Sequence, residues 1–515
     1  MKRLHDRGSF DTMKGIPKTV AVVLPRQHSD LVRLLCIVSA LTLSLAYPVE
    51  TVSVQSQEGP AEEWLSFRGN PVNNASRRFD VHAAGKPKEW TFKPSSWTWA
   101  YRPGTSVWSS PSIAKIGERV VLFVGSYDKN LYALDSFTGE EIWRYTTGGE
   151  IFSTPAVANV NGQWLVFFGS GERVLYALDA AEGSKVWAYQ LVDWRYTVGE
   201  SYVPSPAVFS LGGRKVVLFC WWVSDASFVQ PLETTEALLL DGSNGQWLWQ
   251  KPFSKSPPSS PCVTVIEGRA RLYVSARDGN TYCLDGETGE LLWKHTSRGE
   301  IVGSPACASH LNPPLVFIGS RYGELHALDA RDGHPVRTFK AGHWIDSSPA
   351  VVEMEGESFV IFGSHDQAVY CLNARTKSVR WTFFTRGDVY SSPAVFHADN
   401  DTGPWLAIAS GDDYLYVLDA ASGREVKRYR PGRFLWGYRI VGDSIWPSPV
   451  AARLNGEWML FAPFYDGQVH AYNVSQPDRM VMASSSYGRT MLLKAALTIA
   501  GTVLLVAILF RVAPR

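Results

Sequence analysis

The residues of this 515-residue chain that could do chemistry are aromatic, arginine and acidic side chains in the segments between its repeats. Aromatic rings and guanidinium groups dominate protein-binding hot spots and also stack on sugars, quinones and other planar ligands. They predict a binding face; the alternative is that the rings only pack on one another to stabilise long loops. The candidate ligand-binding residues are Trp97, Trp99, Arg102, Trp108, Trp194, Arg195, Tyr196, Tyr202, Trp221, Trp222, Trp344, Tyr390, Trp436, Tyr438, Arg439 and Trp446.

A second group of candidates is acidic and lies just before a recurring proline. Carboxylate oxygens could coordinate a hard cation at the mouth of a central tunnel. The alternative is a hydrated channel rim that holds no ion. No glycine-rich phosphate loop, HExxH or GxSxG motif occurs, so we assign no catalytic residue and no metal ligand. The acidic candidates are Glu150, Glu300, Asp346, Asp388 and Asp443.

The elements that must position these residues come from an internal repeat, marked by a Ser/Thr-Pro pair. Four of the seven gaps between these prolines are 44 residues long. An Asp or Asn comes after each proline, 24 residues later in six of the eight repeats. Four residues after this Asp or Asn there is usually a Gly, and eight residues after it there is often a Trp. The eight prolines are Pro111, Pro155, Pro206, Pro261, Pro305, Pro349, Pro393 and Pro449.

Each repeat contains four short β-prone runs, which is the pattern of a propeller blade. The proline fits the innermost strand, because a missing N–H costs little at a sheet edge that faces the axis. The Asp-x-x-x-Gly stretch predicts a tight turn whose glycine has positive φ. The tryptophans are expected to fill the wedges between blades, whereas blades five and seven carry Arg337 and Lys427 at that position. The expected structural tryptophans are Trp90, Trp143, Trp187, Trp249, Trp293 and Trp381.

The expected fold is therefore an all-β, eight-bladed β-propeller of four-stranded antiparallel blades. The eighth repeat has no fourth strand, and the isolated run at 89–93 is predicted to supply it and close the ring. In antiparallel blades, the strand 2–3 loops and the links between blades emerge on the same face. The longest insertions all belong to these two classes, so we expect them on one face. They are 93–108, 191–204, 221–236, 251–258 and 430–447.

Apolar segments near both ends predict export and membrane attachment. Residues 34–46 have the length of a signal-peptide core, although an uncleaved anchor remains open. Residues 491–510 are long enough for a single transmembrane helix, which places the propeller on the extracytoplasmic side. The expected divisions are 1–47 (signal or anchor), 48–88 (arm), 89–475 (propeller), 476–489 (linker), 490–511 (transmembrane helix) and 512–515 (tail).

Charge and cysteine spacing indicate against a nucleic-acid partner and against a repeated disulfide framework. The formal net charge is +1 and no basic cluster occurs, so no nucleic-acid partner is expected. Cys220, Cys262, Cys283, Cys307 and Cys371 lie in apolar runs without recurring spacing. They are interpreted as buried small residues rather than as a disulfide framework.

The stretch "LYALDSFTGEEIW", its copies, and "WLSFRGNPVNNAS" at 64–76 resemble the quinoprotein-type, PQQ-like eight-bladed propeller family. This resemblance covers about 64–475 and implies either a PQQ- and Ca²⁺-dependent alcohol dehydrogenase or a scaffold without a cofactor. The dehydrogenases would also imply adjacent cysteines, and no Cys-Cys pair occurs. We therefore expect a noncatalytic scaffold without a cofactor that binds a protein or small planar ligand. A membrane quinoprotein that oxidises an alcohol or sugar, and a carbohydrate-binding surface protein, are the alternatives.

Overall fold

The structure is a computed structural model, and it describes residues 76–79, 87, 89–92, 109–191, 201–225, 232–397, 403–430, 448–463 and 468–475. Contacts divide the chain into Met1–Ala46 and Tyr47–Arg515, and every described residue belongs to the second unit. These residues form strands and turns, and no helix occurs among them. Within this part of the chain, nothing helical has the length and apolar character needed to cross a bilayer. The expected membrane span at 491–510 lies outside the described residues.

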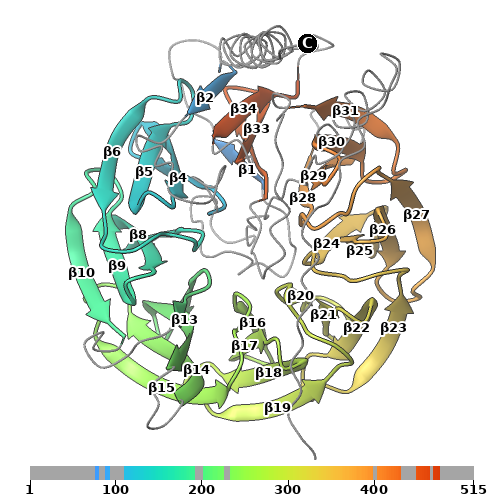
Figure 1. Ribbon diagram of the computed structural model, residues 1–515, viewed down its shortest axis with the longest axis horizontal. Coiled ribbons are helices and arrows are strands. Elements are labelled where there is room, and N and C mark those ends of the chain that lie inside the picture. The colour runs from blue at the N-terminus through green and yellow to red at the C-terminus, as the bar shows by residue number, and fades with distance from the viewer. Residues whose placement is uncertain are drawn as a thin grey trace, which may run out of the picture. The chain divides into compact units, whose positions relative to one another are not determined.

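Eight sheets form the eight blades of a propeller, as expected (Figure 1). In chain order the strands of blades 1 to 4 are β3 (Ser112–Ile116), β4 (Arg119–Gly125), β5 (Asn130–Asp135), β6 (Glu141–Thr146); β7 (Ala156–Val160), β8 (Gln163–Ser170), β9 (Val174–Asp179), β10 (Lys185–Gln190); β11 (Ser201–Tyr202), β12 (Ala207–Leu211), β13 (Arg214–Asp225), β14 (Leu232–Asp241), β15 (Trp247–Ser254); and β16 (Cys262–Ile266), β17 (Arg269–Ser275), β18 (Asn280–Asp285), β19 (Leu291–Thr296).

Blades 5 to 8 repeat the same order of antiparallel strands. Their strands are β20 (Ala306–Ala308), β21 (Leu315–Gly319), β22 (Glu324–Asp329), β23 (Pro335–Lys340); β24 (Ala350–Met354), β25 (Glu357–Ser364), β26 (Ala368–Asn373), β27 (Val379–Phe384); β28 (Ala394–His397), β29 (Pro404–Ser410), β30 (Tyr414–Asp419), β31 (Glu425–Tyr429); and β32 (Val450–Leu454), β33 (Glu457–Pro463), β34 (Val469–Asn473), completed by β1 (Ser76–Phe79) and β2 (Trp90–Phe92).

Blade 8 joins the two ends of the propeller. Strand β2 pairs antiparallel with β34, with Trp90 opposite Ala471, so the predicted closing strand is confirmed. The sequence did not indicate β1, which pairs in parallel with β32 on the inner side of the same sheet. The inner strand of blade 8 is therefore covered, whereas those of the other blades are sheet edges.

Ser/Thr-Pro pairs of several neighbouring blades are joined by hydrogen bonds near the axis. The residue before the proline donates its backbone N–H to the serine hydroxyl of the next blade: Thr154 to Ser205 (2.9 Å), Ser304 to Ser348 (2.8 Å) and Ser348 to Ser392 (3.0 Å). These hydroxyls are buried, so each bond satisfies a backbone donor that water could not reach. The repeat therefore requires a hydroxyl residue at this position as well as a proline.

The six structural tryptophans lie in the wedges between blades, as predicted. Each indole N–H donates to a backbone carbonyl of the following blade at 2.9–3.2 Å, as from Trp249 to Gly286 O. Each ring also covers the positive-φ glycine of that blade's turn; a Cβ built on Gly289 would lie 2.5 Å from the Trp249 ring. The ring and the glycine thus form one unit of blade-to-blade packing.

The wedge after blade 5 packs differently, as predicted. Arg337 occupies the tryptophan position of blade 5, and Lys377, with φ of 63°, replaces the glycine of blade 6. A cavity of about 20 Å³ remains between these blades, lined by Phe317, Phe339 and Leu372 among others. That volume is close to the space one water molecule needs. The tryptophan and the glycine are therefore lost together.

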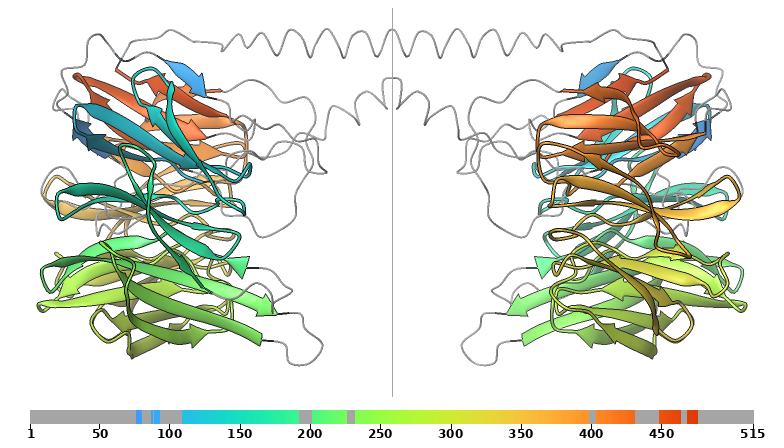
Figure 2. Two further views of the ribbon diagram at one scale, coloured as in Figure 1. Left: turned by 90° about the vertical axis from the view of Figure 1, so that its left-hand side faces the viewer. Right: turned by 90° about the vertical axis from the view of Figure 1, so that its right-hand side faces the viewer.

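The insertion of blade 3 differs from its expectation. Residues 221–236 were predicted as a loop, but β13 continues to Asp225 and β14 begins at Leu232, so most of the insertion is a hairpin that projects from one face (green in Figure 2). Strand β11, from the link after blade 2, pairs with this hairpin at Trp222 and Val223. A link and a strand 2–3 hairpin therefore meet on the same face, as the strand parity requires.

Candidate binding site on the link-and-loop face

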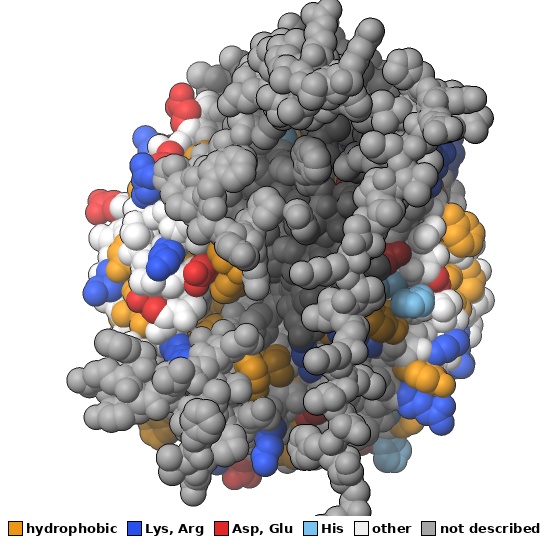
Figure 3. Space-filling view, in the orientation of Figure 1, with side chains coloured by type: hydrophobic (Ala, Val, Ile, Leu, Met, Phe, Trp, Pro, Cys, Tyr) orange, Lys and Arg blue, Asp and Glu red, His pale blue; other side chains and the backbone are white. Residues whose placement is uncertain are grey.

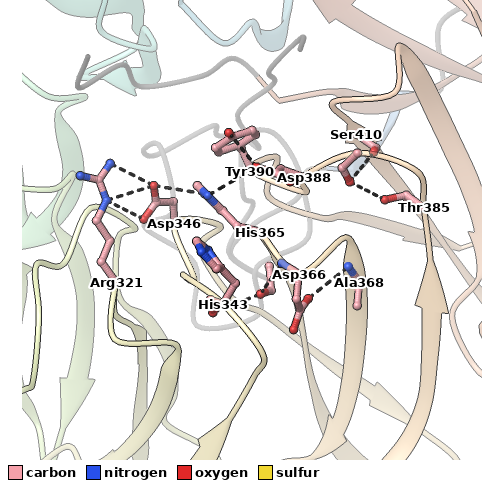
Figure 4. A network of polar contacts seen from close by, with 12 residues as sticks. Arg321, His343, Asp346, His365, Asp366, Ala368, Thr385, Asp388, Tyr390 and Ser410 are labelled. Carbon is pink, nitrogen blue, oxygen red and sulfur yellow. Dashed lines mark hydrogen bonds and ion pairs between the residues drawn. The ribbon is translucent and has the colours of Figure 1, made fainter. Parts of the chain in front are cut away.

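We call the face that carries the strand 2–3 loops and the links between blades the link-and-loop face. Its described part carries a polar cluster between blades 4 and 7. Arg321 follows β21 and His365 follows β25, so both begin strand 2–3 loops. Asp346 lies in the link before β24, and Asp388 and Tyr390 lie in the link before β28. Figure 4 shows these side chains pointing toward one another across three blades. Sequence-distant loops therefore meet because links and strand 2–3 loops share a face.

Asp346 is the centre of this cluster, and only 6% of its side chain is exposed. The Arg321 guanidinium donates to both carboxylate oxygens, at 3.1 Å to Oδ1 and 3.1–3.2 Å to Oδ2. His365 Nε2 lies 3.3 Å from Oδ2, within ion-pair distance but outside hydrogen-bond alignment. Buried carboxylates are stable only when they are paired in this way.

The same groups connect outward to further carboxylates. Arg321 donates to Glu300 at 2.8 Å, and the Glu300 side chain is half exposed. His365 Nδ1 lies 3.9 Å from Asp388 Oδ2, which accepts a hydrogen bond of 3.1 Å from the Tyr390 hydroxyl. The Tyr390 ring packs edge-on against His365, with 4.0 Å between ring centroids. One arginine and one histidine thus hold three acidic residues together.

The electrostatics of Asp346 follow from these contacts. Burial raises the pKa of this carboxyl, but His365 and Arg321 lower it, and the pKa remains below its ordinary value. Asp346 is therefore ionised at neutral pH and carries a charge that its neighbours neutralise. Both of its oxygens face Arg321 and His365, so the carboxylate is already engaged within the protein.

An exposed aromatic side chain, Trp344, packs against this cluster. Trp344 is 42% exposed, yet its ring packs at 5.0 Å against Arg321, at 5.3 Å against His343 and at 5.5 Å against His365. Gly342, two residues earlier, donates its N–H to Asp366 at 2.6 Å, which holds the link in place. The indole is therefore both accessible and fixed.

Cations and a second aromatic ring extend this surface over blade 5. Tyr322 is 45% exposed, Lys340 Nζ lies 3.7 Å from its ring centroid, and Arg298 lies at 5.5 Å. Histidine, acidic and hydrophobic side chains gather on this side of the face in the space-filling view (Figure 3). We call Arg298, Tyr322, Lys340, His343 and Trp344 the blade 5–6 platform.

The described residues place only some of the predicted ligand-binding side chains. Trp344 and Tyr390 lie together in the cluster, and Trp222 is half-buried with its N–H on Lys255 O. Trp221 is 4% exposed and belongs to the core, because strand alternation turns it inward while Trp222 turns outward; its assignment as a surface ligand was wrong. The side chain of Tyr202 lies outside the described atoms, as do Trp97, Trp99, Arg102, Trp108, Trp194, Arg195, Tyr196, Trp436, Tyr438, Arg439 and Trp446.

The acidic candidates gather only in part. Glu300, Asp346 and Asp388 are brought together through Arg321 and His365, while Glu150 lies in the link before blade 2, where its carbonyl accepts from Gly171. Asp443 lies outside the described residues. Among the residues that the structure describes, no three His, Cys, Asp or Glu side chains are arranged to hold a metal ion.

Sequence reasoning missed Arg321, His343 and His365. Arg321 and His365 occupy the position that follows the Gly-Ser at the end of the second strand, and the same position holds Tyr127 and Gly171 in blades 1 and 2. The residue type varies here while its neighbours repeat, and this variation inside a constant frame was the available signal. His343 had no comparable signal, since it lies in a link.

Comparison with known proteins supports the repeat. The family model described as "Outer membrane protein assembly factor BamB" matches residues 96–260 and 233–311. No curated protein matches the chain significantly.

Solved structures resemble the fold at low sequence identity. A europium-containing methanol dehydrogenase has a TM-score of 0.56 at 12% identity, over 79% of this chain and 90% of its own. The quinohemoprotein alcohol dehydrogenase from Comamonas testosteroni has a TM-score of 0.56 at 12% identity, over 82% of each chain. Sqt1 from Saccharomyces cerevisiae has a TM-score of 0.55 at 13% identity, over 76% of this chain and all of its own. These structures show the propeller fold, and the family model places the repeat of the assembly factor at residues 96–260 and 233–311.

Proposed function

We propose that this chain is a noncatalytic scaffold, tethered to a membrane with its propeller on the extracytoplasmic side, that binds a protein partner through the link-and-loop face. The observation that carries the proposal is the blade 5–6 platform, in which Trp344 is 42% exposed but held by three packed neighbours. A side chain that is already fixed loses little conformational entropy on binding. Trp, Tyr and Arg are also the residue types that dominate hot spots.

The charges of the platform favour an acidic segment as the partner. Arg298, Lys340 and His343 are exposed, whereas the nearby carboxylates accept hydrogen bonds within the protein: Glu300 and Asp346 from Arg321, and Asp366 from Gly342 and Tyr370. Aromatic rings under cations would contact the apolar side chains of such a segment, and the cations would contact its carboxylates. The family model that matches residues 96–311 describes an assembly factor, which accords with a protein-binding role.

The carboxylates of this face favour a calcium-bound quinone less than they favour a protein partner. Both oxygens of Asp346 are engaged by Arg321, and His365 lies 3.3 Å from one of them, so that carboxylate would have to leave these partners to ligate a metal ion. The fold likeness to quinoprotein dehydrogenases concerns the blades rather than this donor set. We therefore propose no cofactor-dependent reaction at this face.

Site-specific photocrosslinking from the full-length chain in its native membrane tests the proposal. A benzophenone side chain replaces Trp344 or Tyr322, and the matched control replaces Trp247, which is 54% exposed on the outer strand β15. We expect both platform positions, but not the control, to capture the same protein, and the Lys340→Glu change to reduce that capture. Equal capture from Trp247 would contradict the proposal. Dye-linked alcohol oxidation after addition of PQQ and Ca²⁺, or glycan binding lost on Trp344→Ala, would replace it with an alternative.

A further inference from the structure

The wedge between blades 4 and 5 brings two thiols into contact. Cys262 begins β16 of blade 4, and Cys307 is the middle residue of β20 in blade 5. Both are fully buried, and their Sγ atoms lie 2.8 Å apart, closer than two unbonded sulfur atoms normally approach. The two innermost strands that carry them contact each other along the propeller axis.

Comparison of the repeats shows that this pairing involves two positions at once. The residue after each Ser/Thr-Pro proline is Ser112, Ala156, Ala207, Cys262, Ala306, Ala350, Ala394 and Val450. The residue after that is Ile113, Val157, Val208, Val263, Cys307, Val351, Val395 and Ala451. Cysteine replaces a small or β-branched residue once in each series, and the two exceptions face each other across one wedge. A chance pair of buried thiols would not need to be complementary in this way.

We propose that Cys262 and Cys307 form a disulfide that covalently joins blade 4 to blade 5 in the folded, exported chain. The proposal rests on the extracytoplasmic location proposed above, because disulfides persist in oxidising compartments. No spacing along the sequence indicates the bridge, since it links neighbouring repeats at inequivalent positions. It is therefore compatible with the absence of a recurring cysteine framework.

The chemistry is thiol–disulfide exchange with a disulfide oxidant of the export compartment. The Cys262 thiolate attacks one sulfur of that oxidant, forms a mixed disulfide and displaces one oxidant thiolate. The Cys307 thiolate then attacks Cys262 Sγ and displaces the second. Two protons and two electrons leave the chain, and the oxidant becomes a dithiol. Burial raises the pKa of the Cys307 thiol well above its ordinary value, so the exchange must occur during folding, before the two blades close.

A third cysteine in the same wedge provides the internal control. Cys283 lies in β18, on the far side of Tyr273 from Cys262, because both pair across strands with that tyrosine. The 2.8 Å contact joins Cys262 to Cys307, whereas strand β17 separates Cys283 from Cys262. We expect Cys283 to remain a free thiol.

Peptide mapping of the full-length chain tests the bridge. The protein is recovered from an exporting host, and a second sample is refolded from the reduced, denatured state with oxidised and reduced glutathione. Free thiols are alkylated under denaturing conditions, and the protein is digested and analysed by mass spectrometry without reductant. We expect a cross-linked peptide pair that contains Cys262 and Cys307, about 2 Da lighter than the sum of the thiol peptides, with Cys283 alkylated.

Two outcomes would overturn the proposal: alkylation of both Cys262 and Cys307 in the refolded sample, or a bridge from either of them to Cys283. Bridging in the refolded sample alone would overturn the export clause and leave the geometric pairing. As a second measurement, reductant should lower the midpoint of thermal unfolding of the native chain. It should not shift that of the Cys262→Ala/Cys307→Val variant, which restores the residues of the sister repeats.

Discussion

The pairing of a tryptophan with a glycine in each filled wedge makes a quantitative prediction for Trp249 and Gly289. Trp249 is 7% exposed and donates to Gly286 O at 3.2 Å, and its removal as Trp249→Ala should cost about 3–5 kcal/mol of folding stability. Gly289 has φ of 71°, and a Cβ there would lie 2.5 Å from the indole. Gly289→Ala should therefore combine about 1–2 kcal/mol of backbone strain with about 1–3 kcal/mol of overpacking.

The two changes should not be additive. Once the ring is removed, the added Cβ meets no indole, so only the backbone strain of Gly289→Ala remains. The double variant should thus be more stable than the sum of the single variants predicts, by about 1–3 kcal/mol. Gly268→Ala in the same blade is the matched control, because Gly268 has φ of 77° and open space around its Cβ position.

Denaturant unfolding in detergent of the full-length chain and its four variants measures the five free energies of unfolding. Trp249 and Gly289 meet at one blade boundary, and Gly268 lies in the same blade as Gly289, so all changes report on neighbouring blades of a repeat architecture. The reasoning is refuted if the variants are additive within about 0.5 kcal/mol. It is also refuted if Gly289→Ala costs no more than Gly268→Ala.

Three further predictions concern other contacts. Combining Arg337→Trp with Lys377→Gly should fill the wedge after blade 5 and relieve a positive φ, raising stability by about 1–2 kcal/mol in thermal unfolding, whereas Arg337→Trp alone should clash with the lysine Cβ. Burial and the neighbouring His295 lower the pKa of His326 from 6.5 to about 4, so the unfolded chain binds more protons between these values; stability should fall by about 3 kcal/mol as pH drops through this window, and His326→Gln should flatten that slope. Asp346→Asn should destabilise the chain by about 3–5 kcal/mol at pH 7, because Arg321 loses its buried carboxylate, and the difference should shrink as acid protonates the native carboxyl; an unchanged denaturation midpoint at pH 7 would exclude a structural ion pair there.

The sequence predicts the blades well because each local sequence pattern occurs in most of the eight repeats. The proline at the inner strand, the positive-φ glycine and the wedge tryptophan each recur, so their common structural role could be inferred without neighbours. Their coupling could not, since Trp249 and Gly289 belong to different repeats and only the structure brings them together.

The candidate site was harder to predict because it is built from positions that break the repeat. Glu300, Asp346 and Asp388 were expected near the axis, and the structure adds that Arg321 and His365 lie between them and contact them. Arg321 and His365 lie in strand 2–3 loops, whereas the acidic residues lie in the links between blades. No fixed spacing along the sequence therefore relates the two groups. The hairpin of blade 3 was predicted as a loop because β13 and β14 are longer than the equivalent strands of the other blades, so the residues beyond the usual strand length looked like an insertion.

The arrangement of blade 8 constrains how the protein is made. Thr91 in β2 meets His470 across 379 residues of chain, so at about 5–20 residues per second the ribosome needs roughly 20–75 s to supply the partner strand. Until then β2 lacks its partner β34, and β1 lacks its partner β32. The newly made chain must be kept from pairing with other polypeptides throughout this interval, and any truncation before β34 leaves the ring permanently open.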